Sequence, residues 1–116
     1  MFLKDEADGQ KNIRALSSTA LFGSSAWTSD PSAPLTGNYA AEGPAPLLVG
    51  GQMLLFFDKF ADGLYGALRA QSLDALTAPA SWTDISSSVF FAGVRHGTPI
   101  EVPFEVFRAV ALRAAE

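Results

Sequence analysis

Glu42 is the residue of this chain whose setting best suits acid–base chemistry. It stands in the tripeptide Glu42-Gly43-Pro44, between a polar loop and an apolar strand pattern. The Gly-Pro pair predicts a rigid bend that aims the carboxyl group into a channel. Burial or a neighbouring negative charge would then let this carboxyl keep its proton near neutral pH, as a general acid must. The alternative interpretation is an ordinary solvent-exposed loop glutamate.

Three further polar residues lie where strands are expected to end. His96, the only histidine in the chain, stands in a turn beside Arg95, and Asp58 follows the apolar run 53–57. His96 can bind a water molecule or serve as a hydrogen-bonded structural histidine. Asp58 can face a ligand or close a strand-end salt bridge. We therefore take His96, Arg95 and Asp58 as candidate ligand-binding residues, each with its structural alternative.

The composition favours one folded domain and excludes several classes of partner. The 116 residues are 48% apolar and 17% charged, which is enough to build a core. A net charge of −4 without a Lys/Arg cluster argues against nucleic acid and against an anionic membrane. The chain has no cysteine, so disulfides and thiolate metal sites are excluded. We find neither a membrane-spanning apolar run of about 20 residues nor a signal-peptide pattern, and the compartment stays open.

Short strand patterns separated by glycine turns predict an all-β meander. Two apolar runs around Gly50-Gly51 predict a hairpin, and Pro44 and Pro46 argue against a regular central strand. A segment without glycine or proline, 104–115, predicts a C-terminal helix. The expected strands are 1–4, 12–18, 47–49, 52–58, 65–70, a strand opened by 82–84 and continued through 85–91, and 98–102.

Four segments occur in the order found in the five-bladed β-propeller glycoside hydrolases of the family 43 type, which include arabinofuranosidases, arabinanases and β-xylosidases. The resemblance covers the chain up to about Val102. The segments are Lys4-Asp5-Glu6 followed by Lys11-Asn12-Ile13-Arg14; Glu42-Gly43-Pro44; Phe56-Phe57-Asp58-Lys59-Phe60 followed by Tyr65-Gly66-Ala67; and Trp82-Thr83-Asp84 followed by Arg95-His96-Gly97-Thr98.

The resemblance implies about two four-stranded antiparallel propeller-type blades with a short C-terminal helix. Residues 1–22 would form a blade remnant and the start of the next blade, and 23–46 a loop that carries the Glu-Gly-Pro turn. Residues 47–102 would supply the strands of two blades, and 103–116 the helix. A β-sandwich fits the same strand pattern and is the alternative fold.

The resemblance also implies an activity: hydrolysis of arabinose- or xylose-containing oligosaccharides or plant cell-wall polysaccharides, with Glu42 as the general acid. It implies no cofactor beyond a calcium ion, or a calcium-hydrating water, near His96, and family members are cytoplasmic or secreted. The family's general base and acid-tuning aspartate would both fall before Met1, and Ala7 stands where such sequences often have arginine. The alternatives are a non-catalytic carbohydrate-binding or structural remnant, and an unrelated β-domain that binds proteins.

Two expectations follow from this interpretation. Trp27, Tyr39, Tyr65 and Trp82 can stack on sugar rings, although aromatic residues of β-proteins more often lie in the core or at an interface. Of these four, Trp27 and Tyr65 are taken as candidate substrate-binding residues. About two blades would leave strand edges and apolar faces exposed, so we expect a homo-oligomer. The C-terminal helix is expected to cover one such apolar face.

Overall fold

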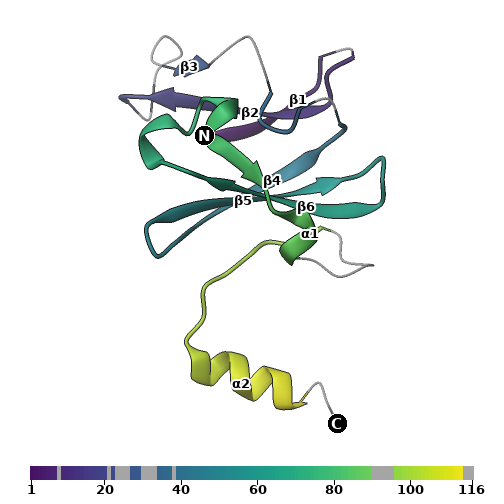
Figure 1. Cartoon of the computed structure of the whole chain (residues 1–116), viewed down its shortest axis with the longest axis vertical. Helices are drawn as coiled ribbons and strands as arrows, with labels where there is room; N and C mark the ends of the chain where they lie inside the picture. The colour runs from purple at the N-terminus through teal and green to yellow at the C-terminus, as the bar shows by residue number, and fades with distance from the viewer. Residues whose placement is uncertain are drawn as a thin grey trace.

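The computed structural model describes residues 1–7, 9–20, 22, 27–29, 34–37, 39–89 and 96–113. Their strands form two antiparallel sheets, which confirms the all-β prediction (Figure 1). In both sheets the strands lie in sequence order, so each sheet is a meander. The smaller sheet contains β1 (Phe2–Asp5), β2 (Asn12–Ser18) and β3 (Trp27–Ser29). The larger contains β4 (Glu42–Val49), β5 (Gln52–Lys59), β6 (Leu64–Ala70) and β7 (Trp82–Asp84).

The β4–β5 hairpin forms where the glycine pair predicts it. Gly50 and Gly51 both have positive φ angles, of 55° and 80°. A two-residue turn of this kind suits the twist of the flanking strands and favours glycine at both positions. The register that follows places Leu47 opposite Leu54 and Glu42 opposite Asp58.

The segment that carries Glu42 is a strand. The predicted loop 23–46 is therefore wrong in two places: at β3, and from Glu42 onward, where β4 begins. β4 is an edge strand, and edge strands tolerate proline because one side of the strand makes no ladder bonds. The register shifts between Glu42 and Ala45, where Gly43 has a φ of 60°. The predicted bend is therefore a β-bulge inside an edge strand.

Two predicted strand segments near the C-terminus are also wrong. After Asp84 the chain turns into a short helix, α1 (Ser86–Val89), because the Asp84 carboxylate accepts hydrogen bonds from the Ser86 amide at 2.8 Å and hydroxyl at 2.6 Å. The rest of the predicted strand, 90–91, lies outside the described residues. The segment 98–102 is extended but unpaired, and Pro99 within it has no N–H for a ladder.

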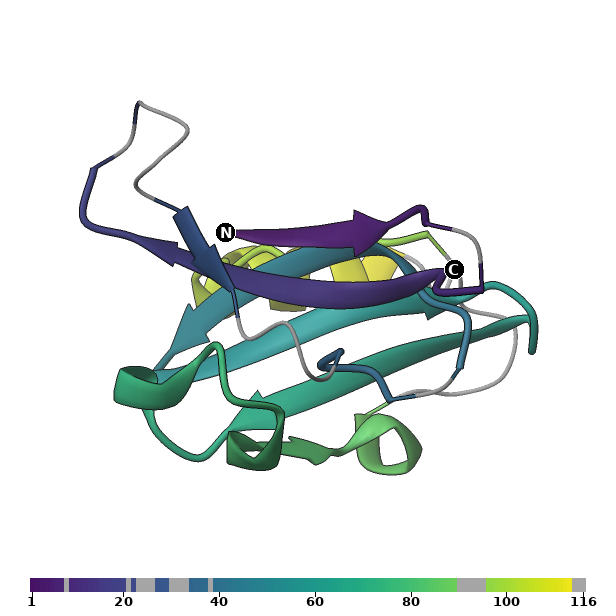
Figure 2. The ribbon, with the colours of Figure 1, turned by 90° about the horizontal axis from the view of Figure 1, so that it is seen from above.

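The main core lies between the two sheets. One face of the larger sheet presents Leu55, Phe57 and Leu68 to Ile13 and Ala15 of β2. Figure 2 shows β1 and β2 crossing over the larger sheet. The opposite face of the larger sheet carries a second cluster around Phe56, Tyr65 and Ala67, on the same side as Asp58. The sheet is thus buried on both faces, and the polar candidates belong to the face turned away from β2.

Gly66 allows this packing because it lies directly opposite Phe57 across β5 and β6. A Cβ atom at Gly66 would stand 2.5 Å from Phe57 Cε2, and the Phe57 side chain is fully buried. We expect Gly66→Ala to lower the free energy of unfolding by about 1–3 kcal/mol, the usual cost of overpacking. Urea denaturation of Gly66→Ala, Phe57→Leu and the double variant checks this, since Gly66→Ala should cost less in the Phe57→Leu background than in the wild-type background. An equal cost of Gly66→Ala in both backgrounds would contradict the steric explanation.

Helix α2 (Phe104–Arg113) confirms the predicted helix but not its predicted place. It stands away from both sheets at the end of an extended linker and covers neither of them (Figure 1). The Phe104 side chain is 70% exposed and that of Phe107 is 59% exposed. The short 3-10 turns Leu73–Ala75 and Pro79–Ser81 lie between β6 and β7. None of the described helices has the length and apolar character to cross a membrane.

Candidate functional site

Glu42, Asp58 and His96 converge on one site. Each offers a carboxylate oxygen or an imidazole nitrogen, and these atoms all lie within 4.8 Å of one another. Glu42 and Asp58 are directly opposite each other on β4 and β5, so their side chains emerge on the same face of the sheet. His96 comes from a distant part of the sequence. The fold therefore joins three residues that sequence reasoning selected separately.

Asp58 is the buried member of the site. Its side chain is 1% exposed, and its Oδ2 lies 2.8 Å from Nε2 of His96, whose side chain is 62% exposed. Buried carboxylates need charged or hydrogen-bonding partners, and His96 supplies one of them. The His96 backbone has a φ of 51°, in the left-handed region that non-glycine residues seldom adopt. The surrounding structure must compensate for this strain of about 1–2 kcal/mol.

Tyr65 lies opposite Asp58 across β5 and β6 and fixes the residue after His96. Its hydroxyl group donates a hydrogen bond to the Gly97 carbonyl oxygen. Burial of the phenol and, to a lesser extent, the negative charge of Asp58 raise the pKa of Tyr65, while the bond to Gly97 opposes this. The hydroxyl therefore stays protonated as a donor. Because the ring is buried, Tyr65 acts on the site through the Gly97 backbone.

Lys4 is a member of the site that sequence reasoning missed. Its Nζ lies 3.0 Å from Glu42 Oε2 and 2.8 Å from Glu6 Oε1, and it stands over the Phe60 ring at 4.8 Å from the centroid. Hydrogen bonds to Glu6 and then to Glu42 raise the pKa of Lys4, so it remains a cation. Glu42 is thus paired with a positive charge from β1. The only sequence signal was the position of Lys4 in the Lys4-Asp5-Glu6 segment.

The distance between the carboxyl groups limits what Glu42 and Asp58 can do together. Inverting glycosidases hold their two carboxyl groups about 6.5–9.5 Å apart to admit a water, and retaining ones about 5–5.5 Å apart. The Glu42 and Asp58 oxygens lie within 4.8 Å, and Asp58 is already bonded to His96. This separation is shorter than the one that either class of glycosidase uses. The two residues are neighbours within one binding site.

The resemblance implies a calcium ion near His96, so the ligand atoms of this site can be compared with the coordination that calcium prefers. Calcium takes six to eight oxygen ligands. The described residues offer two carboxylates and one imidazole here, with Glu42 ion-paired to Lys4 and Asp58 hydrogen-bonded to His96. One nitrogen with two carboxylates is closer to the preference of a transition ion such as zinc. The set does not fit a calcium cage.

The remaining candidates do not join this site. Trp27 lines a different cavity of about 440 Å³, together with Phe2, Ser17 and Asp74. Neither Glu42 nor His96 borders that cavity. Arg95 lies outside the described residues. The site that the structure assembles thus consists of Glu42, Asp58, His96, Tyr65 and Lys4.

Comparisons with protein-family models, with curated proteins and with solved structures find no match for this chain. The assignment of function therefore depends on the geometry of the site and on the residues of the Glu-Gly-Pro and Arg-His-Gly segments.

Proposed function

We propose that this chain carries the acid-bearing part of a glycoside-hydrolase-type propeller site and recognises arabinose- or xylose-containing oligosaccharides. The observation that supports the proposal is the convergence of Glu42, Asp58 and His96 within 4.8 Å. Glu42 belongs to the Glu-Gly-Pro segment of the resemblance, and His96 belongs to the Arg-His-Gly segment. The third residue, Asp58, comes from the strand that follows the Glu-Gly-Pro segment. Four separate stretches of sequence thus contribute to one polar site once Lys4 is included.

The chemistry of these groups suits a ligand rich in hydroxyl groups. The Glu42 carboxylate can accept hydrogen bonds and the Lys4 ammonium can donate them. His96 is largely exposed beside Glu42, so its free ring edge can reach the same ligand. The hydroxyl groups of a neutral sugar both donate and accept hydrogen bonds, so they pair with donors and acceptors in the site. Such a ligand does not require the site to carry a net charge. Hydrogen bonds to charged groups contribute about 1.5–3 kcal/mol each, which is enough for specific binding.

For the chain by itself, a second candidate function is sugar binding without cleavage. It is favoured by the short separation of Glu42 and Asp58 and by the ion pair between Glu42 and Lys4. A general acid must donate a proton to the leaving group, whereas the Glu42 carboxyl group here lies 3.0 Å from the Lys4 ammonium. Cleavage would therefore need a further carboxyl group, placed about 6.5–9.5 Å from Glu42 in an inverting reaction.

The test is to measure binding and turnover on the same protein. We expect calorimetry to detect binding of arabino- or xylo-oligosaccharides. In Glu42→Gln the affinity should fall by about tenfold or more, since the charged hydrogen bond is lost. Glu105→Gln on α2 removes the same charge from an exposed helix and should leave the affinity unchanged. Release of nitrophenol from aryl arabinofuranosides or xylosides measures cleavage.

The outcomes separate the two functions. Turnover that is lost in Glu42→Gln would support a complete hydrolase. Binding without turnover would support the non-catalytic function. If the wild-type chain neither binds nor cleaves these sugars, the proposed function is wrong, and a role in protein interaction would replace it.

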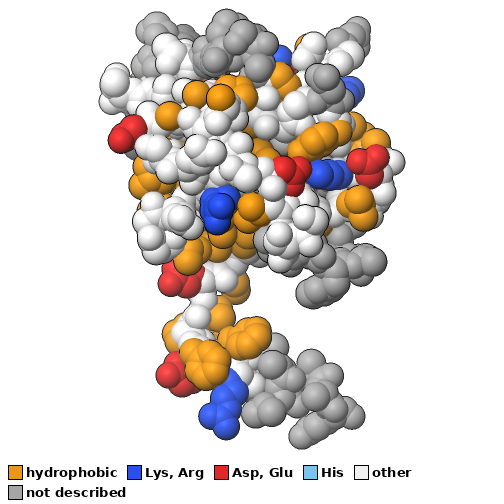
Figure 3. Space-filling model, in the orientation of Figure 1, with side chains coloured by type: hydrophobic (Ala, Val, Ile, Leu, Met, Phe, Trp, Pro, Cys, Tyr) orange, Lys and Arg blue, Asp and Glu red, His pale blue; other side chains and the backbone are white. Residues whose placement is uncertain are grey.

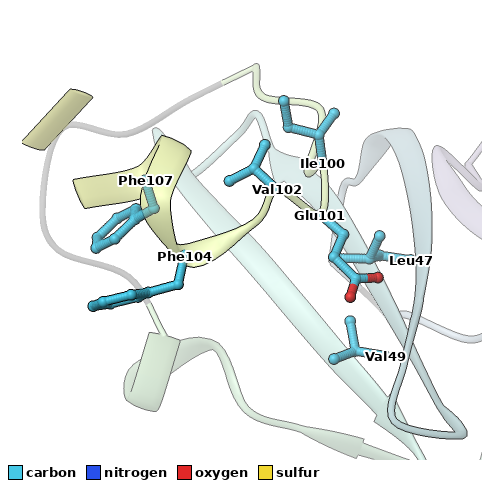
Figure 4. A pocket seen from close by; sticks show the side chains of 7 residues that line it. All are labelled: Leu47, Val49, Ile100, Glu101, Val102, Phe104 and Phe107. Atoms are coloured by element: carbon cyan, nitrogen blue, oxygen red, sulfur yellow. The ribbon is translucent and has the colours of Figure 1, made fainter. Parts of the chain in front are cut away.

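We also propose that the chain associates with a second copy of itself through its C-terminal arm, defined here as residues 98–113. The arm and β4 border an apolar groove of about 380 Å³ (Figure 4), whose lining residues are Leu47, Val49, Ile100, Glu101, Val102, Phe104 and Phe107. Figure 3 shows apolar side chains gathered on the arm, with charged ones beside them. A contiguous exposed apolar patch of this kind is typical of an interaction site.

Charge favours a second copy as the occupant of this surface. In the arm, Glu105 precedes Arg108 by three residues, and both are exposed. If two arms cross antiparallel near Val106 and Phe107, Glu105 of each copy lies beside Arg108 of the other. The pairing is isologous, so one surface complements itself.

A further inference from the structure

We infer that Asp58 and Tyr65 are positioning residues: together they hold His96 as its Nε2–H tautomer and leave its Nδ1 as a hydrogen-bond acceptor. The tautomer follows from the structure alone. The assignment of a sugar hydroxyl as the group that donates to Nδ1 rests on the proposed function.

The tautomer follows from the chemistry of the Asp58–His96 contact. An ionised carboxylate has only acceptor oxygens, so a neutral imidazole that bonds to it must carry its proton on the nitrogen that faces it. That nitrogen is Nε2, at 2.8 Å from Asp58 Oδ2. The other nitrogen, Nδ1, is then unprotonated and accepts. Carboxylates orient metal-binding and catalytic histidines in the same way, by fixing which ring nitrogen is free.

The position of the ring is fixed from two adjacent points. Asp58 holds the His96 side chain, and the Tyr65 hydroxyl holds the carbonyl group of Gly97, the next residue. Asp58 and Tyr65 are cross-strand partners on β5 and β6, so both anchors stand on one rigid, buried part of the sheet. Two anchors on consecutive residues explain how His96 is kept at a φ of 51°.

The ring edge that bears Nδ1 is the one open to a ligand. Asp58 is buried and occupies the Nε2 edge, while 62% of the His96 side chain is exposed. An atom of the imidazole lies within 4.8 Å of a Glu42 carboxylate oxygen. A ligand that contacts the exposed part of His96 therefore meets an unprotonated Nδ1 acceptor, and the Glu42 carboxylate and the Lys4 ammonium belong to the same site.

Because His96 is the only histidine, its imidazole can be observed without overlap. We propose nitrogen NMR of the ¹⁵N-histidine-labelled chain at about pH 9, above the ordinary imidazole pKa of about 6.5. The wild-type chain is expected to show only the Nε2–H tautomer, and Asp58→Ala is expected to show both tautomers. Asp62→Ala removes an exposed carboxylate from the turn after β5 and should leave the wild-type spectrum. An Nδ1–H form in the wild-type chain would overturn the inference, whether or not Asp58→Ala folds.

Tyr65→Phe is the second variant, since it keeps the buried ring and removes only the hydroxyl group. We expect it to retain the Nε2–H tautomer and to lower the heteronuclear NOE of the Gly97 amide, because the turn loses one anchor. Tyr39→Phe, which removes a hydroxyl bonded to Asp84 at 3.3 Å, is the matched control. An unchanged Gly97 amide in Tyr65→Phe would refute the role of Tyr65.

Titration of the labelled chain with an oligosaccharide separates this inference from the proposed function. A ligand-dependent shift that is larger at Nδ1 than at Nε2 would support the assigned acceptor. A sugar that binds and leaves Nδ1 unshifted would overturn it. The Nε2–H tautomer in a chain that binds no sugar would refute the proposed function and support the positioning role of Asp58.

Discussion

Replacing Phe57 by alanine is expected to lower the free energy of unfolding by about 3–5 kcal/mol, the usual loss for a fully buried phenylalanine. Phe57 lies in the core between the two sheets, and its ring stacks on Tyr39 with centroids 6.1 Å apart. Truncation would leave a cavity that the rigid pair of sheets cannot close. A domain of this size has about 5–15 kcal/mol of stability in total, so the variant should be close to unfolding.

Urea denaturation followed by tryptophan fluorescence measures this loss. Leu48→Ala is the control, because Leu48 lies on the same hairpin but is exposed, and it should change the stability by less than about 0.5 kcal/mol. Similar losses in the two variants would mean that the core between the sheets does not form as described.

Exchanging Phe104 and Phe107 for serine is expected to convert a self-associating chain into a monomer. Burial of a phenylalanine side chain contributes about 1.5–3 kcal/mol, so the loss of two per arm should weaken association by at least about 100-fold. Sedimentation velocity at micromolar concentration measures the effect. Phe22→Ser, which changes an exposed phenylalanine outside the arm, is the control and should not affect association.

The antiparallel arrangement of the arms makes a sharper prediction about charge. Glu105→Arg should weaken association, because two positive charges would meet across the contact, and Glu105→Arg/Arg108→Glu should restore it. A wild-type chain that is monomeric at micromolar concentration would refute the proposed association. Failure of the charge exchange to restore it would refute the antiparallel arrangement alone.

Local chemistry made several elements predictable. Gly50-Gly51 specifies its own turn, and the strands on either side follow from it. The C-terminal helix follows from a run without glycine or proline. The strand at Glu42 was not predictable in this way, because two prolines are compatible with a strand only at a sheet edge. Which strand is at the edge depends on the pairing of the whole sheet.

The candidate site also combines residues that local sequence predicts with an arrangement that depends on long-range pairing. Glu42, Asp58, Tyr65 and His96 were selected from their local settings, but their proximity depends on the β4–β5–β6 register and on the return of the chain at 96–97. Lys4 was missed because its contact with Glu42 joins strands of two different sheets. Trp27 was chosen for its chemistry, and its place on β3 puts it at another cavity. Residue type predicts the chemistry of a side chain, whereas long-range strand pairing determines its position in the fold.

The prolines of β4 have a consequence for the addition of a further strand at this edge of the larger sheet. Neither Pro44 nor Pro46 has an amide hydrogen, and β4 tolerates them because it lies at the edge of the larger sheet. Two positions on the outer margin of the sheet therefore have no hydrogen to offer to an incoming strand. An added strand would find fewer amide donors along β4 than along an edge without prolines, which disfavours edge-to-edge pairing at this strand.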